Sequence, residues 1–164
     1  MAELEQILIG DAAAAAPAAV LEGLTNEIVH RGIDGAPRTI YEELWHTAFW
    51  LELSLDWIRG IETPFPPHDA DGFPGDDAIR RESWARLRER FLAGLESARA
   101  AVQDRERLDQ PIRCPSRPGH PVRVMTVREQ LENMAAHNAY HLGRMVLMRQ
   151  LLRAWPPPSG GYSW

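Results

Sequence analysis

Glycine and proline are distributed unevenly along this chain, and their distribution limits the fold more than any other feature. They cluster in residues 32–37, 60–75, 111–121 and 156–161, and the long segments between these clusters are almost free of both. Because glycine and proline interrupt regular structure, we expect the uninterrupted segments to be helices. No alternating run of β-branched and aromatic residues competes with them, although residues 123–127 could extend briefly. The sequence therefore predicts an all-α protein.

Two of the expected helices begin with a recognisable capping signal. Residues 39–42 read Thr-Ile-Tyr-Glu and residues 126–129 read Thr-Val-Arg-Glu, in which a hydroxyl residue is followed three positions later by a glutamate. A kink or restart is expected near Pro17 in the first helix. The four expected helices span about 3–29, 39–59, 76–107 and 126–153.

The spacing of these helices predicts a single domain over residues 1–164. The third helix carries a buried stripe at steps of three and four residues, formed by Trp84, Leu87, Phe91, Leu95, Ala98 and Val102. Roughly 15 residues connect the second helix to the third, which is long enough to cross one end of a bundle. We therefore expect a four-helix bundle with a long crossover between its second and third helices.

The basic residues exclude several classes of function. All 18 are arginines, so the chain cannot use a Schiff-base lysine or a phosphate-loop lysine. The formal net charge is −5, and the arginine-rich stretch is interleaved with acidic residues. A nucleic-acid surface needs a clustered basic field, so we expect no nucleic-acid partner.

Cysteine content and hydrophobicity bear on the compartment. The only cysteine, Cys114, cannot form an internal disulfide, so nothing requires an oxidising environment. The first residues are acidic where a signal peptide would be basic, and no apolar stretch is long enough to span a membrane. We expect a cytoplasmic protein without a membrane partner.

Three histidines are predicted to face the interior of the bundle. His137 and His141 project onto the same side of the fourth helix as Met134 and Met145, and His46 lies on a helix that is apolar around most of its circumference. A single buried histidine is more often paired with a backbone carbonyl, and one i, i+4 pair is weak evidence. Three buried imidazoles are costly unless they share a partner, and one divalent metal ion satisfies all three.

The pattern around these histidines favours a metal site with an open position. The segment from His137 to His141 lacks the glutamate that zinc peptidases carry beside the first histidine, so a peptidase is disfavoured. Three imidazoles leave at least one coordination position for water or substrate, as in catalytic zinc sites. Zinc, nickel, copper and iron all suit imidazole ligands, so the identity of the metal stays open.

Several other side chains are candidates for substrate binding or for orienting the histidines. Arg144 lies near the metal-facing side of its helix and could hold an anionic substrate group or pair with a glutamate. Glu42 and Glu43 precede His46 by one turn and could orient an imidazole, act as a base or complement the helix dipole. Asn138 could line the mouth of the site or pack in the core.

Two segments of the chain resemble a known family. Residues 135–158, AAHNAYHLGRMVLMRQLLRAWPPP, are very similar to the final helix of DinB-like proteins, and residues 35–53, GAPRTIYEELWHTAFWLEL, resemble their second helix. The order and spacing of these features match over essentially the whole chain. The resemblance implies a four-helix bundle with up-down-down-up connectivity and a divalent ion held by His46, His137 and His141.

The resemblance leaves two classes of function open. Some DinB-like proteins are metal-dependent thiol transferases that use a low-molecular-weight thiol, whereas many have no established reaction. The first hypothesis is a thiol transferase or hydrolase in which the ion activates a thiol or water for attack on a small electrophile. The alternative is a non-catalytic metal-binding or stress-associated module, which a fourth protein ligand would favour. Tryptophan-rich helices and the wide apolar surface of the second helix lead us to expect a homodimer.

Overall fold

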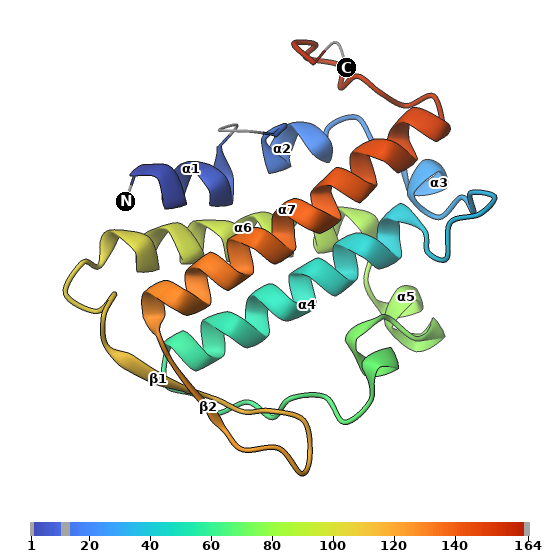
Figure 1. The fold of residues 1–164 in the computed structure, drawn as a ribbon. Helices are drawn as coiled ribbons and strands as arrows, with labels where there is room; N and C mark the ends of the chain where they lie inside the picture. Colours follow the sequence, from blue (N-terminus) through green and yellow to red (C-terminus); the bar gives the residue numbers. More distant parts are fainter. Residues whose placement is uncertain (1, 11–13, 163–164) are drawn as a thin grey trace.

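The computed structural model describes residues 2–10 and 14–162, and these are mostly helical, as the sequence predicts (Figure 1). The helices are α1 (Ala2–Ile9), α2 (Pro17–Val20), α3 (Asn26–Val29), α4 (Ile40–Ile58), the 3₁₀ helix η1 (Asp69–Gly72), α5 (Asp76–Arg81), α6 (Trp84–Gln103) and α7 (Val127–Leu151). Two short antiparallel strands, β1 (Pro111–Cys114) and β2 (Arg123–Thr126), form a hairpin before α7. Within the described residues, none of the helices combines the length and the apolar character needed to cross a membrane.

Helices α4 and α7 begin at the predicted caps. The hydroxyl groups of Thr39 and Thr126 accept hydrogen bonds from the backbone N–H groups of Glu42 and Glu129 at 3.3 and 3.1 Å. Each glutamate carboxylate in turn accepts a bond from the backbone N–H of its threonine, at 2.8 and 2.7 Å. Gly60, with φ of 84°, follows the end of α4. The two helices that carry the candidate histidines therefore start where the sequence places them.

The prediction of one helix over residues 76–107 is wrong at two points. Glu82 has an extended backbone, and the Ser83 hydroxyl accepts a bond from the backbone N–H of Arg86 at 3.4 Å, so a new helix, α6, begins there. Serine favours this cap because its side chain competes for backbone hydrogen bonds. Helix α6 also ends at Gln103, four residues early. The predicted stripe is confirmed, since all six of its members are buried.

The first expected helix is divided into three short ones. Pro17 starts α2, which confirms the expected restart, and the Thr25 hydroxyl caps α3. Gly23 lies between them with φ of 71°, in the left-handed region that favours glycine. A Cβ at Gly23 would approach Cγ of Pro158 to 2.6 Å, so the chain also needs a small residue there. Residues 11–13 of this expected helix lie outside the described residues.

Three long helices form the centre of the structure. Helix α4 packs against both α6 and α7. Figure 1 shows that α4 and α6 run in the same direction and that α7 runs in the opposite one. Helix α1 packs against α6 and α7, so the short N-terminal helices occupy the place that was expected for a fourth long helix.

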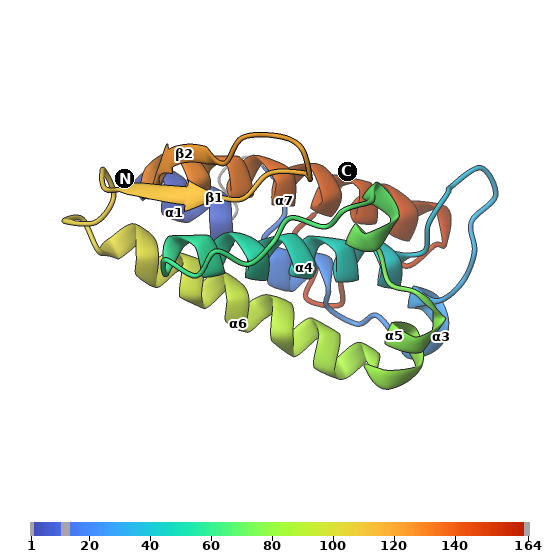
Figure 2. The same cartoon turned by 90° about the horizontal axis from the view of Figure 1, so that it is seen from below.

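The crossover between α4 and α5 and the hairpin run along the same side of α4 (Figures 1 and 2). An ion pair joins them, because Arg117 of the hairpin loop lies 2.5 Å from Asp69 of η1. A second pair links Arg113 of β1 to Glu62 of the crossover at 2.8 Å. These contacts hold two irregular segments over the face of α4 that carries His46.

A buried arginine ties the N-terminal helices to the end of α7. Arg149 is 1% exposed, and its guanidinium donates hydrogen bonds to the carbonyl oxygens of Ala19, Val20 and Ala154 at 2.6 to 3.1 Å. Burial lowers the pKa of Arg149. The side chain therefore satisfies three carbonyl groups from two segments that are far apart in the sequence.

We predict that Arg149→Met lowers the free energy of unfolding by about 3 kcal/mol, because the three carbonyl groups would remain buried without their donor. Urea denaturation followed by circular dichroism measures this change. Arg88→Met is the matched control, since Arg88 is an exposed helical arginine, and it should change the free energy by less than about 0.5 kcal/mol. Equal effects of the two substitutions would contradict the role given to Arg149.

Candidate metal centre

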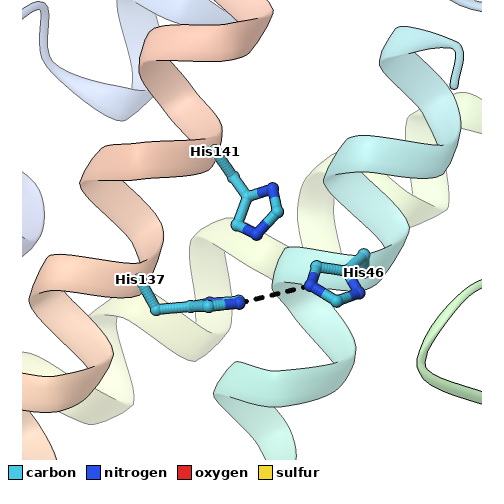
Figure 3. Close-up of side chains that lie close together, drawn as sticks. All are labelled: His46, His137 and His141. Atoms are coloured by element: carbon cyan, nitrogen blue, oxygen red, sulfur yellow. Dashed lines mark hydrogen bonds between the residues drawn. The ribbon is translucent and has the colours of Figure 1, made fainter. Parts of the chain in front are cut away.

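Three imidazole rings from two helices converge on one point. His46 comes from α4, and His137 and His141 come from consecutive turns of α7 (Figure 3). One ring nitrogen of each lies within 4.8 Å of the other two. The Nε2 atoms of His46 and His137 are 3.2 Å apart. His141 is buried and the other two are partly buried, so the point of convergence is at the edge of the core.

Hydrogen bonds to Nδ1 orient two of these rings. Nδ1–H of His46 donates to the carbonyl oxygen of Gly72 at 2.8 Å, and Nδ1–H of His141 donates to the Glu43 carboxylate at 2.7 Å. A neutral ring that carries its proton on Nδ1 has a lone pair on Nε2. Metal-ligating histidines have this arrangement, in which the second ring nitrogen donates to a carbonyl or carboxylate.

The arrangement of nitrogens fits a divalent metal ion. Two imidazole nitrogens that bind one zinc ion tetrahedrally, each at about 2.0–2.1 Å, lie about 3.3 Å apart. The 3.2 Å between the Nε2 atoms of His46 and His137 agrees with this spacing. Among the described residues, the group consists of three histidines without a cysteine or carboxylate ligand. Such a donor set suits zinc, nickel, copper or iron and leaves coordination positions free.

The environment favours the neutral form of two of the rings. Burial, together with the neighbouring His141 and His46, lowers the pKa of His137 to about 4. Burial also lowers the pKa of His46, against the opposing effect of its bond to Gly72. Since a metal ion binds the neutral ring, both histidines are ready to act as ligands near neutral pH.

Glu43 is the buried carboxylate behind the histidines. Its side chain is 1% exposed, and its Oε1 lies 2.8 Å from Nη2 of Arg144, while Oε2 accepts the bond from His141. Burial alone raises the pKa of Glu43, but the hydrogen bond from His141 and the charge of Arg144 outweigh it and lower the net pKa. The ionised carboxylate therefore holds the ring of His141 in one orientation.

The remaining sequence candidates occupy different places. The Glu42 carboxylate bonds to the backbone and hydroxyl groups of Thr39 in the capping box, so the contact with the histidines is made by Glu43. Arg144 was expected either to hold a substrate anion or to pair with a glutamate, and the structure shows it paired with Glu43. It also donates a hydrogen bond to the Tyr140 hydroxyl at 3.2 Å.

Asn138 points into the protein rather than into solvent. It is 2% exposed, and neither its amide nitrogen nor its amide oxygen has a hydrogen-bond partner among the described residues. Burying an amide without a partner is costly. Its side chain does interact with the neighbouring His137 ring, where it raises the pKa against the larger effects that lower it.

The crossover segment holds His46 from the opposite side, which sequence reasoning missed. Phe73 stacks on the His46 ring with centroids 4.1 Å apart, and Arg38 lies over Phe73 at 4.4 Å. A Cβ at Gly72 would lie 3.2 Å from Nε1 of Trp50, so a glycine lets the loop come close to α4. The sequence signal that could have indicated this contact is the Gly72-Phe73 pair, a glycine next to an aromatic residue in a long crossover.

A cavity of about 410 Å³ adjoins the histidines. His46 and His137 both line it, together with residues of α4, α7, the crossover and the hairpin. Four of the lining residues are aromatic, namely Trp50, Trp57, Phe65 and Phe73. This volume lies within the range of small-molecule sites. An ion held by the histidines would thus be accessible from a partly apolar cavity.

We predict that Glu43→Gln weakens zinc binding by about tenfold to a hundredfold, because the amide is a poorer acceptor for Nδ1–H of His141. Competition with a chromophoric chelator measures the affinity. Glu42→Gln is the matched control one residue away, and it should leave zinc affinity nearly unchanged while lowering stability by up to about 1 kcal/mol through the weakened cap. Similar zinc affinities for the two variants would show that the Glu43 contact does not matter.

Comparison with known proteins agrees with this geometry. No curated protein matches the chain. A family model described as the DinB superfamily matches residues 11–145, a range that contains all three histidines. The match covers most of the sequence, and the matched residues also include the crossover and the hairpin that line the cavity. The chain belongs to the DinB superfamily.

Proposed function

We propose that the protein is a metal-dependent enzyme that binds one divalent ion through His46, His137 and His141 and acts on a small molecule in the adjoining cavity. The reaction class that we favour is transfer of a low-molecular-weight thiol to a small electrophile. The observation that carries the proposal is the position of the histidines, since the three imidazoles converge and two of them, His46 and His137, line a cavity.

Each part of the site has a defined role in this proposal. A bound divalent ion would supply Lewis acidity and lower the pKa of a thiol or water molecule that contacts it. Glu43 and the Gly72 carbonyl hold the histidine rings in place through Nδ1. The aromatic side chains make part of the cavity wall apolar, so that a substrate bound against them would displace water and strengthen the electrostatic interactions there. No further acid–base pair is required for this chemistry.

The second candidate function is a metal-binding or stress-associated module without turnover. The buried Glu43 contacts with His141 and Arg144 would serve such a module equally well, because they stabilise the junction of α4 and α7. The cavity favours the enzyme, since a module has no need of a space beside the ion.

We also propose that the helices have the up-down-down-up connectivity that the resemblance to DinB-like proteins implies. A further proposal, from the sequence and the surface, is that the chain forms a homodimer. Large apolar side chains are exposed along one face of α7, namely Tyr140, Leu147 and Leu151, with exposed fractions of 56 to 60%. An exposed apolar stripe of this kind supports self-association.

Metal content is the first test of the proposal. Untagged protein purified without an immobilised-nickel column should contain about one divalent ion per chain by elemental analysis. His46→Ala, His137→Ala and His141→Ala should each remove most of it and keep a helical circular dichroism spectrum, because packing of the long helices supplies most of the stability. His120→Ala, in the exposed hairpin loop, should keep the ion. If one of the three variants keeps its ion, the histidine replaced in that variant is not a metal ligand.

Turnover is the second test. The same metal-loaded samples are incubated with glutathione or cysteine and 1-chloro-2,4-dinitrobenzene, and conjugation is followed by absorbance. We expect a rate above the buffer rate that is lost in His46→Ala and after removal of the ion with a chelator. Full metal content without conjugation, and without any spectral change of the cobalt-substituted protein on addition of thiol, would favour the module instead.

A further inference from the structure

We propose that the cavity beside the histidines binds a small anion with a flat apolar body, such as an aromatic carboxylate, and that Arg123 pairs with its negative charge. The idea that this anion is a substrate rests on the proposed function above. The binding itself does not rest on that function, because Arg123 and the cavity walls are present whether or not a metal ion is bound.

The walls of the cavity select the body of the ligand. Trp50 and Phe65 both line it and pack against each other, with ring centroids 5.0 Å apart and planes inclined by 50°, so together they form one aromatic wall. Nε1–H of Trp57, a third wall residue, already donates to the carbonyl oxygen of Thr63 at 2.8 Å. That indole therefore offers its apolar surface rather than its donor. An aromatic wall of this kind packs well against a planar unsaturated group.

The register of the hairpin brings Arg123 to the cavity. Cys114 and Arg123 are directly paired across the two strands, so their side chains project from the same face. Cys114 is buried and bonds to Gln130 of α7, which identifies this face as the one turned toward the helices, and Arg123 lies exposed at its edge, at the rim of the cavity. Arg113 and Val124 form the neighbouring pair and project from the opposite face.

The charges around the cavity leave Arg123 uncompensated. Arg117 is paired with Asp69 at 2.5 Å and lies 5.9 Å from the centre of the Phe65 ring. Arg123 also lines the cavity, and it makes no ion pair within the part of the chain that the structure describes. One arginine charge is thus balanced by Asp69 and the other is free. An anion whose charge lies at the hairpin end can make a bidentate contact with that free guanidinium.

The test compares two probes of nearly the same shape, of which only one is charged. We expect 2-naphthoate to bind the protein at least about tenfold more tightly than 2-naphthamide, as measured by isothermal titration calorimetry. The measurement uses chelator-treated protein, so that a carboxylate cannot owe its affinity to a bound ion. In Arg123→Gln the two probes should bind with equal affinity, while the amide keeps the affinity that it has for the unchanged protein.

Arg113→Gln is the matched control, because it removes an arginine from the opposite face of the same hairpin and should keep the preference for naphthoate. The proposal is overturned if neither probe binds, if acid and amide bind equally to the unchanged protein, or if both arginine variants lose the preference alike. These outcomes are independent of metal content. If the protein binds a divalent ion when one is supplied but shows no preference for the acid after chelator treatment, this inference alone is refuted. If it shows the preference but takes up no ion when one is supplied, only the metal-dependent function is refuted.

Discussion

The hydrogen bonds from Nδ1 of His46 and His141 are the interactions on which the rest of the site depends. They direct the Nε2 lone pairs of both rings to the point where His137 also arrives, and each of them requires a distant part of the chain. The bond to Gly72 needs the crossover to fold back over α4. The bond to Glu43 needs a carboxylate in the core, which Arg144 keeps ionised at the edge of α7. The metal centre, the crossover and the packing of α4 on α7 therefore form one connected unit.

Features that depend on residues close in sequence were predicted well. The starts of α4 and α7 followed from two capping boxes, because a cap is made by residues three positions apart. The inward direction of the three histidines followed from helical periodicity, which needs only the helix itself. The buried stripe of α6 was also correct. By contrast, Ser83 begins a new helix inside a segment that had been expected to be continuous, and Thr25 begins one after the restart expected at Pro17. Neither was predicted, because a single serine or threonine also occurs often within helices.

Contacts between distant residues could not be predicted in the same way. Glu42 and Glu43 are adjacent, and both precede His46 by about one turn, but Glu42 was already committed by the Thr39 cap. Recognising that commitment would have left Glu43 as the residue available to His141. The stacking of Phe73 on His46 and the position of Arg123 at the cavity depend on how the crossover and the hairpin fold over α4. Helical periodicity carries no information about either segment.

The most direct test of the central claim is a crystal structure of the zinc-loaded protein, with the ion located by anomalous scattering at the zinc edge. The account predicts one ion bound by Nε2 of His46, His137 and His141 at about 2.0–2.1 Å, with its remaining position open to the cavity. An ion bound at other residues, or a fourth protein ligand that closes the site, would contradict the account.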